Sequence, residues 1–303
     1  MDKYRPSNAV PFSGFITLII AAILVALIAG GIVAFIANQF NFYLVMLFPL
    51  LMGIVAGGVT GLVVKSSKIR NPLVAALFGL LAGVGVYGVY HVGRYILFRQ
   101  TTIQQIASEN SVSQTEADVA FDQVLKKETG TTGFIGFMKY RADAGISIVP
   151  TSSIDTSGTI SFSGQGVYIY WGLELLAIAL ISGTMASQQA RQPFCENCNS
   201  WYTGKGVIGS VERKQSRQFV KLLKRGEFGQ AKALFNTSQK FPRTVLQMDY
   251  CRTCQTGPVR VTAKSVNRRA RSQGVLAHGM VSRERLPELV SVAAGTGGAT
   301  PQA

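Results

Sequence analysis

Long apolar stretches without charged residues alternate with short polar turns along the first part of the chain. Phe15–Ala37 and Phe42–Val64 contain no charge, Leu73–Phe98 contains only Arg94, and Val167–Gly183 contains only Glu174. A helix rises about 1.5 Å per residue, so about 20 residues cross a hydrocarbon core of about 30 Å. We therefore predict four transmembrane helices, at about 15–37, 42–64, 73–98 and 166–186.

Basic residues indicate how these helices are oriented. Basic residues lie close to the N-terminus and in the turn at 65–70. The tail from Ser187 onward has nineteen basic and six acidic residues, net +13. Residues 99–165 have five basic and seven acidic residues, net −2. Basic loops stay in the cytoplasm, which places both termini there. The first apolar stretch is longer than the roughly 7–15 apolar residues of a signal peptide, so we expect it to be retained.

Composition agrees with this division of the chain. Only 15% of the residues are charged and 48% are hydrophobic, against about 25% charged in an average soluble protein, and the formal net charge is +15. These values exclude a disordered chain and argue against a single soluble globule. We expect a multi-pass protein of a prokaryotic plasma (inner) membrane, with its basic tail against the anionic lipids of the inner leaflet.

Small residues recur at helical spacing in the second and third stretches. Gly53, Gly57 and Gly61 lie four residues apart, as do Gly79 and Gly83. Such stripes let helices approach closely in lipid, so we expect these two helices to form a tight hairpin. A glycine-lined permeation path is the alternative, and the frequency of glycine in membrane helices favours packing.

Three ionisable residues fall within the apolar stretches. His91 and Arg94 lie late in the third, and Glu174 lies early in the fourth. His91 and Glu174 are each expected about 10 Å below the outer surface, so Glu174 can pair with His91 or Arg94. The group is either the proton or ion site of a small transporter or channel, or a structural pair that fixes helix register. No helix is broken at mid-depth, as transporter sites often require, which favours the structural interpretation.

The segment 99–165 is predicted to be a small extracytoplasmic cap. A helix is expected after an N-cap at Thr115, ending at Gly130. Gly133–Arg141 is apolar with a basic end and can lie on the membrane surface. Thr151–Gly166 shows the alternation of a short hairpin. No catalytic constellation is visible in this segment.

All four cysteines lie in the tail, as the pairs Cys195/Cys198 and Cys251/Cys254. Two CxxC turns supply four thiolates, which complete the tetrahedral shell of one structural Zn²⁺ ion. A reducing cytoplasm disfavours a disulfide, and a redox dithiol needs only one pair. An iron–sulfur site is a further alternative. Gly257 is expected to allow the tight turn after the second pair.

The segment 187–291 is predicted to be a zinc-binding domain with a helical insertion. The 52 residues between the pairs exceed the roughly 15–20 of a simple ribbon. Two helices are expected there, at 216–223 and 228–235. Strands are expected at 245–250 and 259–266, on either side of the second pair. In its ligands and short flanks the tail resembles the zinc-ribbon class, and residues 292–303 look like a flexible end.

Function is the least defined property. The chain contains no phosphate-binding loop, HExxH or GxSxG motif, and only two histidines. It resembles prokaryotic multi-pass proteins with an appended zinc module, which implies a non-enzymatic scaffold or subunit for protein assembly, with protein partners or further copies of itself. The tail's basic residues, including Lys221, Lys224 and Arg225, allow a nucleic-acid tether, but aromatic residues are sparse among them.

Overall fold

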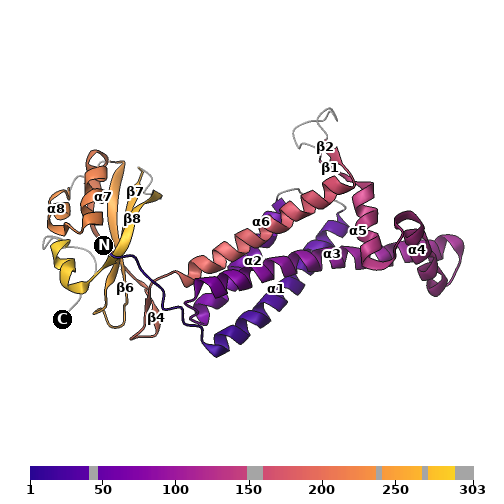
Figure 1. The fold of residues 1–303 in the computed structure, drawn as a ribbon, viewed down its shortest axis with the longest axis horizontal. Helices are drawn as coiled ribbons and strands as arrows, with labels where there is room; N and C mark the ends of the chain where they lie inside the picture. The colour runs from indigo at the N-terminus through magenta and orange to yellow at the C-terminus, as the bar shows by residue number, and fades with distance from the viewer. Residues whose placement is uncertain (41–46, 149–159, 237–240, 268–271, 291–303) are drawn as a thin grey trace. The chain divides into compact units, whose positions relative to one another are not determined.

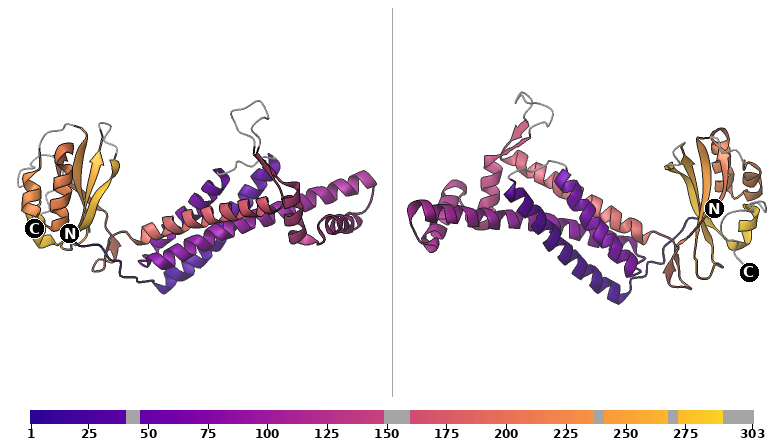
Figure 2. Two further views of the ribbon diagram at one scale, coloured as in Figure 1. Left: turned by 45° about the horizontal axis from the view of Figure 1, so that its top comes forward. Right: turned by 180° about the vertical axis from the view of Figure 1, so that it is seen from behind.

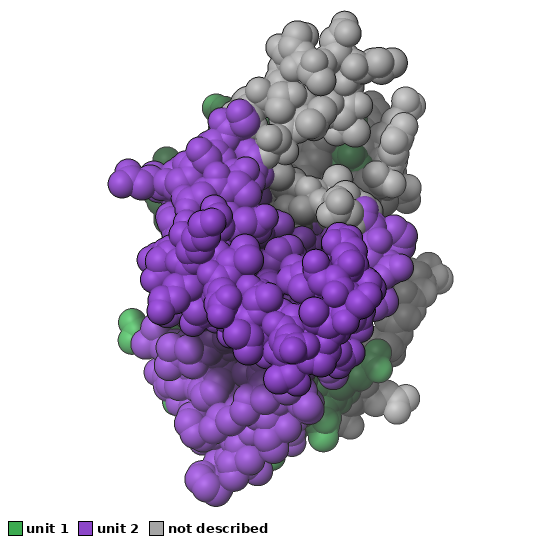
Figure 3. All heavy atoms as spheres, turned by 90° about the vertical axis from the view of Figure 1, so that its right-hand side faces the viewer, with its two compact units in different colours: residues 1–7, 191–303 green, residues 8–190 purple. Residues whose placement is uncertain are grey.

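The computed structural model describes residues 1–40, 47–148, 160–236, 241–267 and 272–290. The chain divides into two compact units, coloured separately in Figure 3. We call residues 8–190 the helical unit and residues 1–7 with 191–303 the tail unit. The flexible end predicted at 292–303 lies outside the described residues.

Four long helices run side by side in the helical unit (Figures 1 and 2). They are α1 (Phe12–Gln39), α2 (Leu47–Ser66), α3 (Pro72–Asn110) and α6 (Gln165–Ala190). All four are long and apolar enough to cross a membrane, with mean hydropathies of 3.0, 2.2, 2.0 and 1.6 over their most apolar windows. The four predicted membrane helices are confirmed to this extent, although the predicted start of the second, at 42–46, lies outside the described residues.

Large apolar side chains cover the outside of this bundle. Ile28, Leu173 and Leu180 are 60%, 61% and 55% exposed. Small residues are frequent where the helices meet, including Ala56 and Ala186, which are fully buried. A soluble bundle buries most of its large apolar residues, so the many exposed ones here suit a surface covered by lipid tails.

The predicted glycine stripes face α6 instead of each other. A Cβ at Gly57 would lie 2.7 Å from the Cα of Ser182, and one at Gly79 would lie 2.5 Å from the carbonyl oxygen of Ser182. At Gly83 the added carbon would lie 2.4 Å from the Ser182 hydroxyl, and at Gly53 it would lie 3.0 Å from Ile181. The expectation of a hairpin between α2 and α3 built on these stripes is therefore corrected: α2 and α3 both offer small residues to α6.

A second small-residue contact joins α1 to α3, and the sequence analysis missed it. A Cβ at Gly30 would lie 2.6 Å from the carbonyl oxygen of Val86, and one at Gly85 would lie 2.9 Å from Ala26. Ala26, Gly30 and Ala34 repeat every four residues in α1, which is the signal that would have predicted this contact.

Beyond the bundle, α3 continues to Asn110, twelve residues past the end predicted at 98, and carries the cap helices α4 (Gln114–Thr129) and α5 (Gly133–Ala144). The Arg99 guanidinium forms an ion pair with Asp118 at 2.5 Å. Phe98 packs against the rings of Phe121 and Phe137, 6.1 and 5.4 Å away. The polar residues after position 98 thus remain helical because α4 and α5 pack on that extension.

The N-terminus of α4 corrects one prediction. Ser113, not Thr115, caps the helix: its hydroxyl accepts a hydrogen bond from the Glu116 amide at 3.3 Å. The Glu116 carboxylate accepts one from the Ser113 amide at 2.9 Å. This reciprocal capping box satisfies two free amides at once, and the helix begins at Gln114, one residue before Thr115. The predicted end at Gly130 is confirmed, with φ of 74°.

A two-stranded ladder, β1 (Ile146–Ile148) with β2 (Ile160–Phe162), precedes α6. The hairpin predicted within Thr151–Gly166 is right for its second strand only. Its first strand comes earlier in the chain, and residues 149–159 between the strands lie outside the described residues. Strand β2 leads directly to α6, whose first residue, Gln165, agrees with the expected start at 166.

The tail unit is built on a four-stranded antiparallel sheet. The strands, in spatial order, are β5 (Gly204–Glu212), β6 (Arg243–Tyr250), β7 (Val259–Val266) and β8 (Ser272–Val281). The helices α7 (Ser216–Arg225) and α8 (Phe228–Ala233) pack on one face of this sheet, with the short 3-10 helices η1 (Arg213–Gln215) and η2 (Arg283–Glu288) (Figure 1). Phe219, Leu223 and Leu246 are fully buried between the layers.

The predicted helices and the strands at 245–250 and 259–266 are confirmed in this unit. The sequence analysis missed β5 and β8, which flank those two strands. Strand β5 has four glycine or serine residues among its nine. This composition obscures the alternation of apolar and polar residues by which a strand is predicted. The segment between the cysteine pairs is therefore part of the sheet as well as a helical insertion.

Residues 1–7 belong to the tail unit, although the four long helices separate them from it along the chain. The Asp2 amide donates to the Met280 carbonyl at 3.1 Å, and the Met280 amide donates to the Asp2 carbonyl at 2.7 Å. The N-terminal segment thus pairs with β8 at the edge of the sheet. Covering an exposed edge in this way removes unpaired backbone groups.

The contact between α3 and α6 gives a direct test. We expect Gly79→Ala to destabilise the helical unit by about 1–3 kcal/mol, because its new methyl group overlaps the Ser182 backbone. Gly88→Ala on the same helix is the control, since a Cβ there meets nothing within 4 Å. Thermal unfolding of the purified protein in detergent measures both. Equal unfolding temperatures for the two variants would contradict the packing described here.

Candidate metal centre

The first cysteine pair lies in a tight turn of the tail unit. Strands β3 (Phe194–Cys195) and β4 (Ser200–Trp201) pair antiparallel and enclose Cys198 between them. The Asn199 amide donates to the Glu196 carbonyl at 3.3 Å, and Asn199 has φ of 48°. Asparagine tolerates this left-handed conformation better than most residues, so the sequence suits the turn.

The second pair lies in a turn of the same kind between β6 and β7. Cys251 follows the last residue of β6, and the Gln255 amide donates to the Cys251 carbonyl at 3.2 Å. Gln255 has φ of 51°, one residue after Cys254, as Asn199 comes one residue after Cys198. The left-handed residue of this turn is Gln255, whereas Gly257, which was expected to allow the turn, has no positive φ.

The two turns bring the four cysteines together. Their sulfur atoms all lie within 4.8 Å of one another, and the Sγ atoms of Cys195 and Cys254 are 3.7 Å apart. Four ligands about 2.3 Å from a central ion at tetrahedral angles are about 3.8 Å apart. None of the four cysteines forms a disulfide. The predicted set is therefore positioned to hold a metal ion.

Hydrogen bonds prepare this cluster to bind a cation. The backbone amide and hydroxyl of Thr256 donate to the Cys254 sulfur and lower the pKa of that thiol to about 6. The Cys198 thiol donates to Cys254, which raises the pKa of Cys198 to about 12. One thiolate is thus favoured at neutral pH before a metal binds, and the ion displaces the remaining protons as it binds.

Aromatic residues enclose the first turn. The rings of Phe194 and Trp201 meet edge to face at 4.9 Å. The Tyr202 hydroxyl donates to the Pro258 carbonyl at 2.8 Å, which links the first turn to the strand after the second. The Phe194 amide donates to the Tyr4 hydroxyl at 3.2 Å, so the N-terminal segment also supports the centre. Nothing in the sequence alone connects Tyr4 with the cysteines.

The predicted intramembrane group has a different organisation from the expected ion pair. Glu174 on α6 is 6% exposed, and its carboxylate accepts hydrogen bonds from Tyr87 on α3, at 2.9 Å, and from Tyr170 one turn earlier. Neither tyrosine was predicted from the sequence as a partner of Glu174. Hydroxyl donors on a buried carboxylate reduce the cost of placing it in lipid.

His91 and Arg94 lie next to this carboxylate network. The His91 ring contacts the rings of Tyr87, Tyr90 and Trp171, with centroids 4.5, 4.9 and 5.4 Å away. His91 and Glu174 therefore share Tyr87 as a neighbour. Arg94 lines a void of about 10 Å³ together with His91 and Arg141, which is room for about one water molecule.

Comparisons with protein-family models, with curated proteins and with solved structures find no match to this chain. Its chemistry therefore has to be inferred from its own residues.

The four-cysteine cluster makes a quantitative prediction. The purified full-length protein is expected to contain about one metal ion per chain by elemental analysis. We expect Cys251→Ser to remove that ion and to lower the unfolding temperature of the tail unit, because the unit loses the link between its two turns. Arg252→Ser changes an exposed neighbour in the same turn and is expected to keep the metal ion and the wild-type unfolding temperature. A wild-type protein with no metal and a redox-active disulfide would contradict the assignment.

Proposed function

We propose that this chain is a non-enzymatic integral membrane protein that holds a zinc-stabilised domain at the membrane surface, as a scaffold or subunit for protein assembly. The observation that carries this proposal is the set of four cysteine side chains whose sulfur atoms lie within 4.8 Å of one another. Four protein ligands complete a tetrahedral shell, so no position is left for water or substrate. Such a centre stabilises a small domain and does not catalyse a reaction.

Ligand chemistry supports zinc as the metal. Four thiolates in tetrahedral arrangement select zinc or iron, and zinc with four cysteines is the usual structural centre of ribbon-like domains. The 3.7 Å separation of the Cys195 and Cys254 sulfurs supports a single ion, because it matches the edge of one tetrahedron. We infer a structural Zn²⁺ in a zinc-ribbon-like module.

The proposed orientation places the tail unit in the cytoplasm of a prokaryotic cell, with the membrane helices in the plasma membrane. The net charge of +13 on the tail and of −2 on residues 99–165 supports it. The pairing of Asp2 with Met280 gives independent support for placing both ends on one side. Four crossings return the chain to that side.

The basic surface of the tail unit supports a role in assembly at the membrane. Its sheet carries basic residues such as Lys205 and Arg260 on its strands, and α7 carries Arg217, Lys221 and Lys224 on its exposed side. A positive surface next to a membrane attracts anionic lipids. We propose that the domain stays close to the inner leaflet and there binds a protein partner or a second copy of the chain.

Transport of a proton or small ion is a second candidate, and one observation favours it. A buried carboxylate with two tyrosine donors, as at Glu174, is a group that a proton pathway could use. The void next to it, of about 10 Å³, is far smaller than a substrate pathway requires. We therefore place this function second.

Gentle purification from native membranes tests the assembly proposal. We expect the wild-type chain to recover a defined partner, or to elute as a defined oligomer. Cys251→Ser with Cys254→Ser is expected to lose that association because its tail unit unfolds without metal. Arg252→Ser, which keeps all four ligands, is the matched control and is expected to retain the association.

Flux measurements in proteoliposomes distinguish the two candidates. Wild-type protein that carries protons or ions, with flux abolished by Glu174→Gln and unaffected by Cys251→Ser, would overturn the assembly proposal in favour of transport. Tyr87→Phe removes one hydrogen-bond donor to Glu174. If this variant also lost flux, the transport activity would be assigned to the carboxylate network.

A further inference from the structure

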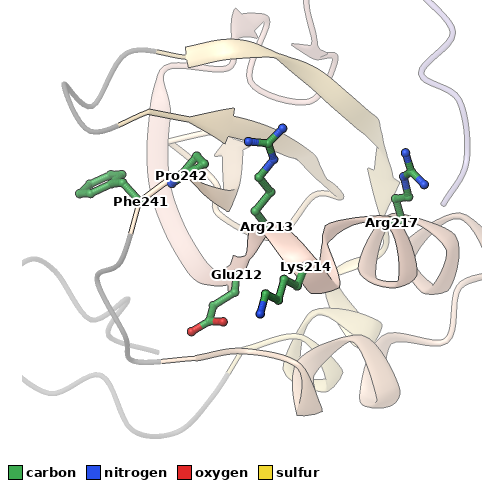
Figure 4. A pocket seen from close by; sticks show the side chains of 6 residues that line it. All are labelled: Glu212, Arg213, Lys214, Arg217, Phe241 and Pro242. Atoms are coloured by element: carbon green, nitrogen blue, oxygen red, sulfur yellow. The ribbon is translucent and has the colours of Figure 1, made fainter.

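An open pocket of about 540 Å³ lies where the sheet of the tail unit meets α7, away from the cysteines (Figure 4). The pocket is lined by Glu212, Arg213, Lys214, Arg217, Phe241 and Pro242. The first three lie at the end of β5 and in η1, Arg217 lies in the first turn of α7, and the last two directly precede β6. The pocket is separate from the metal centre and from the membrane helices, because it shares no lining residue with either.

Specific contacts hold the two sides of the pocket together. The hydroxyls of Ser216 and Thr244 are hydrogen-bonded at 2.7 Å, which joins the start of α7 to β6. The Arg243 guanidinium stacks over the Phe241 ring, 4.8 Å from its centroid. The pocket is therefore held in shape by side-chain contacts as well as by the strand pairing of Glu212 with Arg243.

The charges that line this pocket are unbalanced. Three of the six lining residues are cations and one is an acid. The Glu212 carboxylate accepts a hydrogen bond from the side-chain amide of Asn236 at 3.2 Å. Within the described part of the chain, none of the three cations takes part in an ion pair. The cations thus keep their capacity to bind an anion.

The directions of the side chains fit an anionic ligand. In Figure 4, Arg213 and Arg217 extend to the same side of the ribbon, with Arg213 between Arg217 and Pro242, whereas Glu212 and Lys214 extend to the other side. Guanidinium groups bind phosphate oxygens with two parallel hydrogen bonds, which gives both affinity and geometry. We propose that this pocket binds the phosphate group of an organic phosphate ester through Arg213 and Arg217.

The volume of the pocket and its apolar residues indicate the size and character of the organic part of the ester. A volume of about 540 Å³ exceeds what inorganic phosphate fills and lies in the range of small-molecule sites. The Phe241 ring and Pro242 offer an apolar surface to the body of the ester. The phosphate could belong to a phospholipid headgroup or to a soluble metabolite, and both present the same group to the arginines.

Calorimetric titration of the full-length protein tests this site. The protein is held in phosphatidylcholine nanodiscs at low salt and titrated with glycerol phosphate, and separately with a water-soluble short-chain phosphatidic acid. We expect saturable binding that weakens about tenfold or more in Arg213→Gln with Arg217→Gln, since two charge-assisted contacts are lost. Lys126→Gln with Lys127→Gln removes two exposed charges from α4, in the helical unit and outside the pocket, and is expected to change affinity less than twofold.

The relative affinities of the two probes distinguish the two sources of the phosphate group. Tighter binding of the short-chain lipid than of glycerol phosphate assigns the site to a lipid headgroup, and equal binding assigns it to a soluble ester. Absence of saturable binding by either probe, or equal weakening in the two double variants, overturns the proposal. Metal content and unfolding temperature, measured on all proteins, confirm that the variants are folded. The site does not depend on the proposed assembly role, because partner recovery and phosphate binding are measured separately.

Discussion

The contact between the N-terminal segment and the distant tail is the constraint on which the tail unit depends. Asp2 bridges to the edge strand β8 and Tyr4 supports the first cysteine turn, while all other residues of the unit follow the last long helix. An even number of crossings brings both ends to one side of a bilayer, so the four helices and the tail unit are mutually consistent. The metal centre then links two turns that are 52 residues apart in sequence.

Lipid imposes a second constraint on the same chain. Helices in a bilayer gain no hydrophobic free energy from meeting each other, so contact depends on close approach. Ser182 meets three glycines, Gly57, Gly79 and Gly83, and its hydroxyl is satisfied by the Ile178 carbonyl of its own helix at 2.8 Å. Glu174, two turns away on α6, carries the polar interaction with α3. Packing and one hydrogen-bonded carboxylate thus fix the position of α6 in the bundle.

The sequence predicted those parts of the fold that depend on local pattern. Charge-free length identified the four helices, and the spacing of Cys195, Cys198, Cys251 and Cys254 identified a set of side chains that is positioned to hold a metal ion. Contacts between distant segments could not be read in this way, because they depend on which faces meet in three dimensions. The stripe of Gly79 indicated a contact but not that α6 makes it. Strand β5 was missed because its glycines obscure the alternation of apolar and polar residues. The partners of Glu174 were missed because the position of a tyrosine in the sequence does not reveal which group its hydroxyl contacts.

Labelling of native lysines from each side of the membrane tests the shared location of the two chain ends most directly. Lys3, Lys126 and Lys205 are all exposed and belong to the N-terminal segment, the cap and the tail sheet respectively. With a membrane-impermeant amine reagent and mass spectrometry, Lys3 and Lys205 are predicted to react only in inside-out vesicles, and Lys126 only in intact cells. Labelling of Lys3 and Lys205 from opposite sides would contradict the pairing of the N-terminus with the tail unit and the four-crossing topology together.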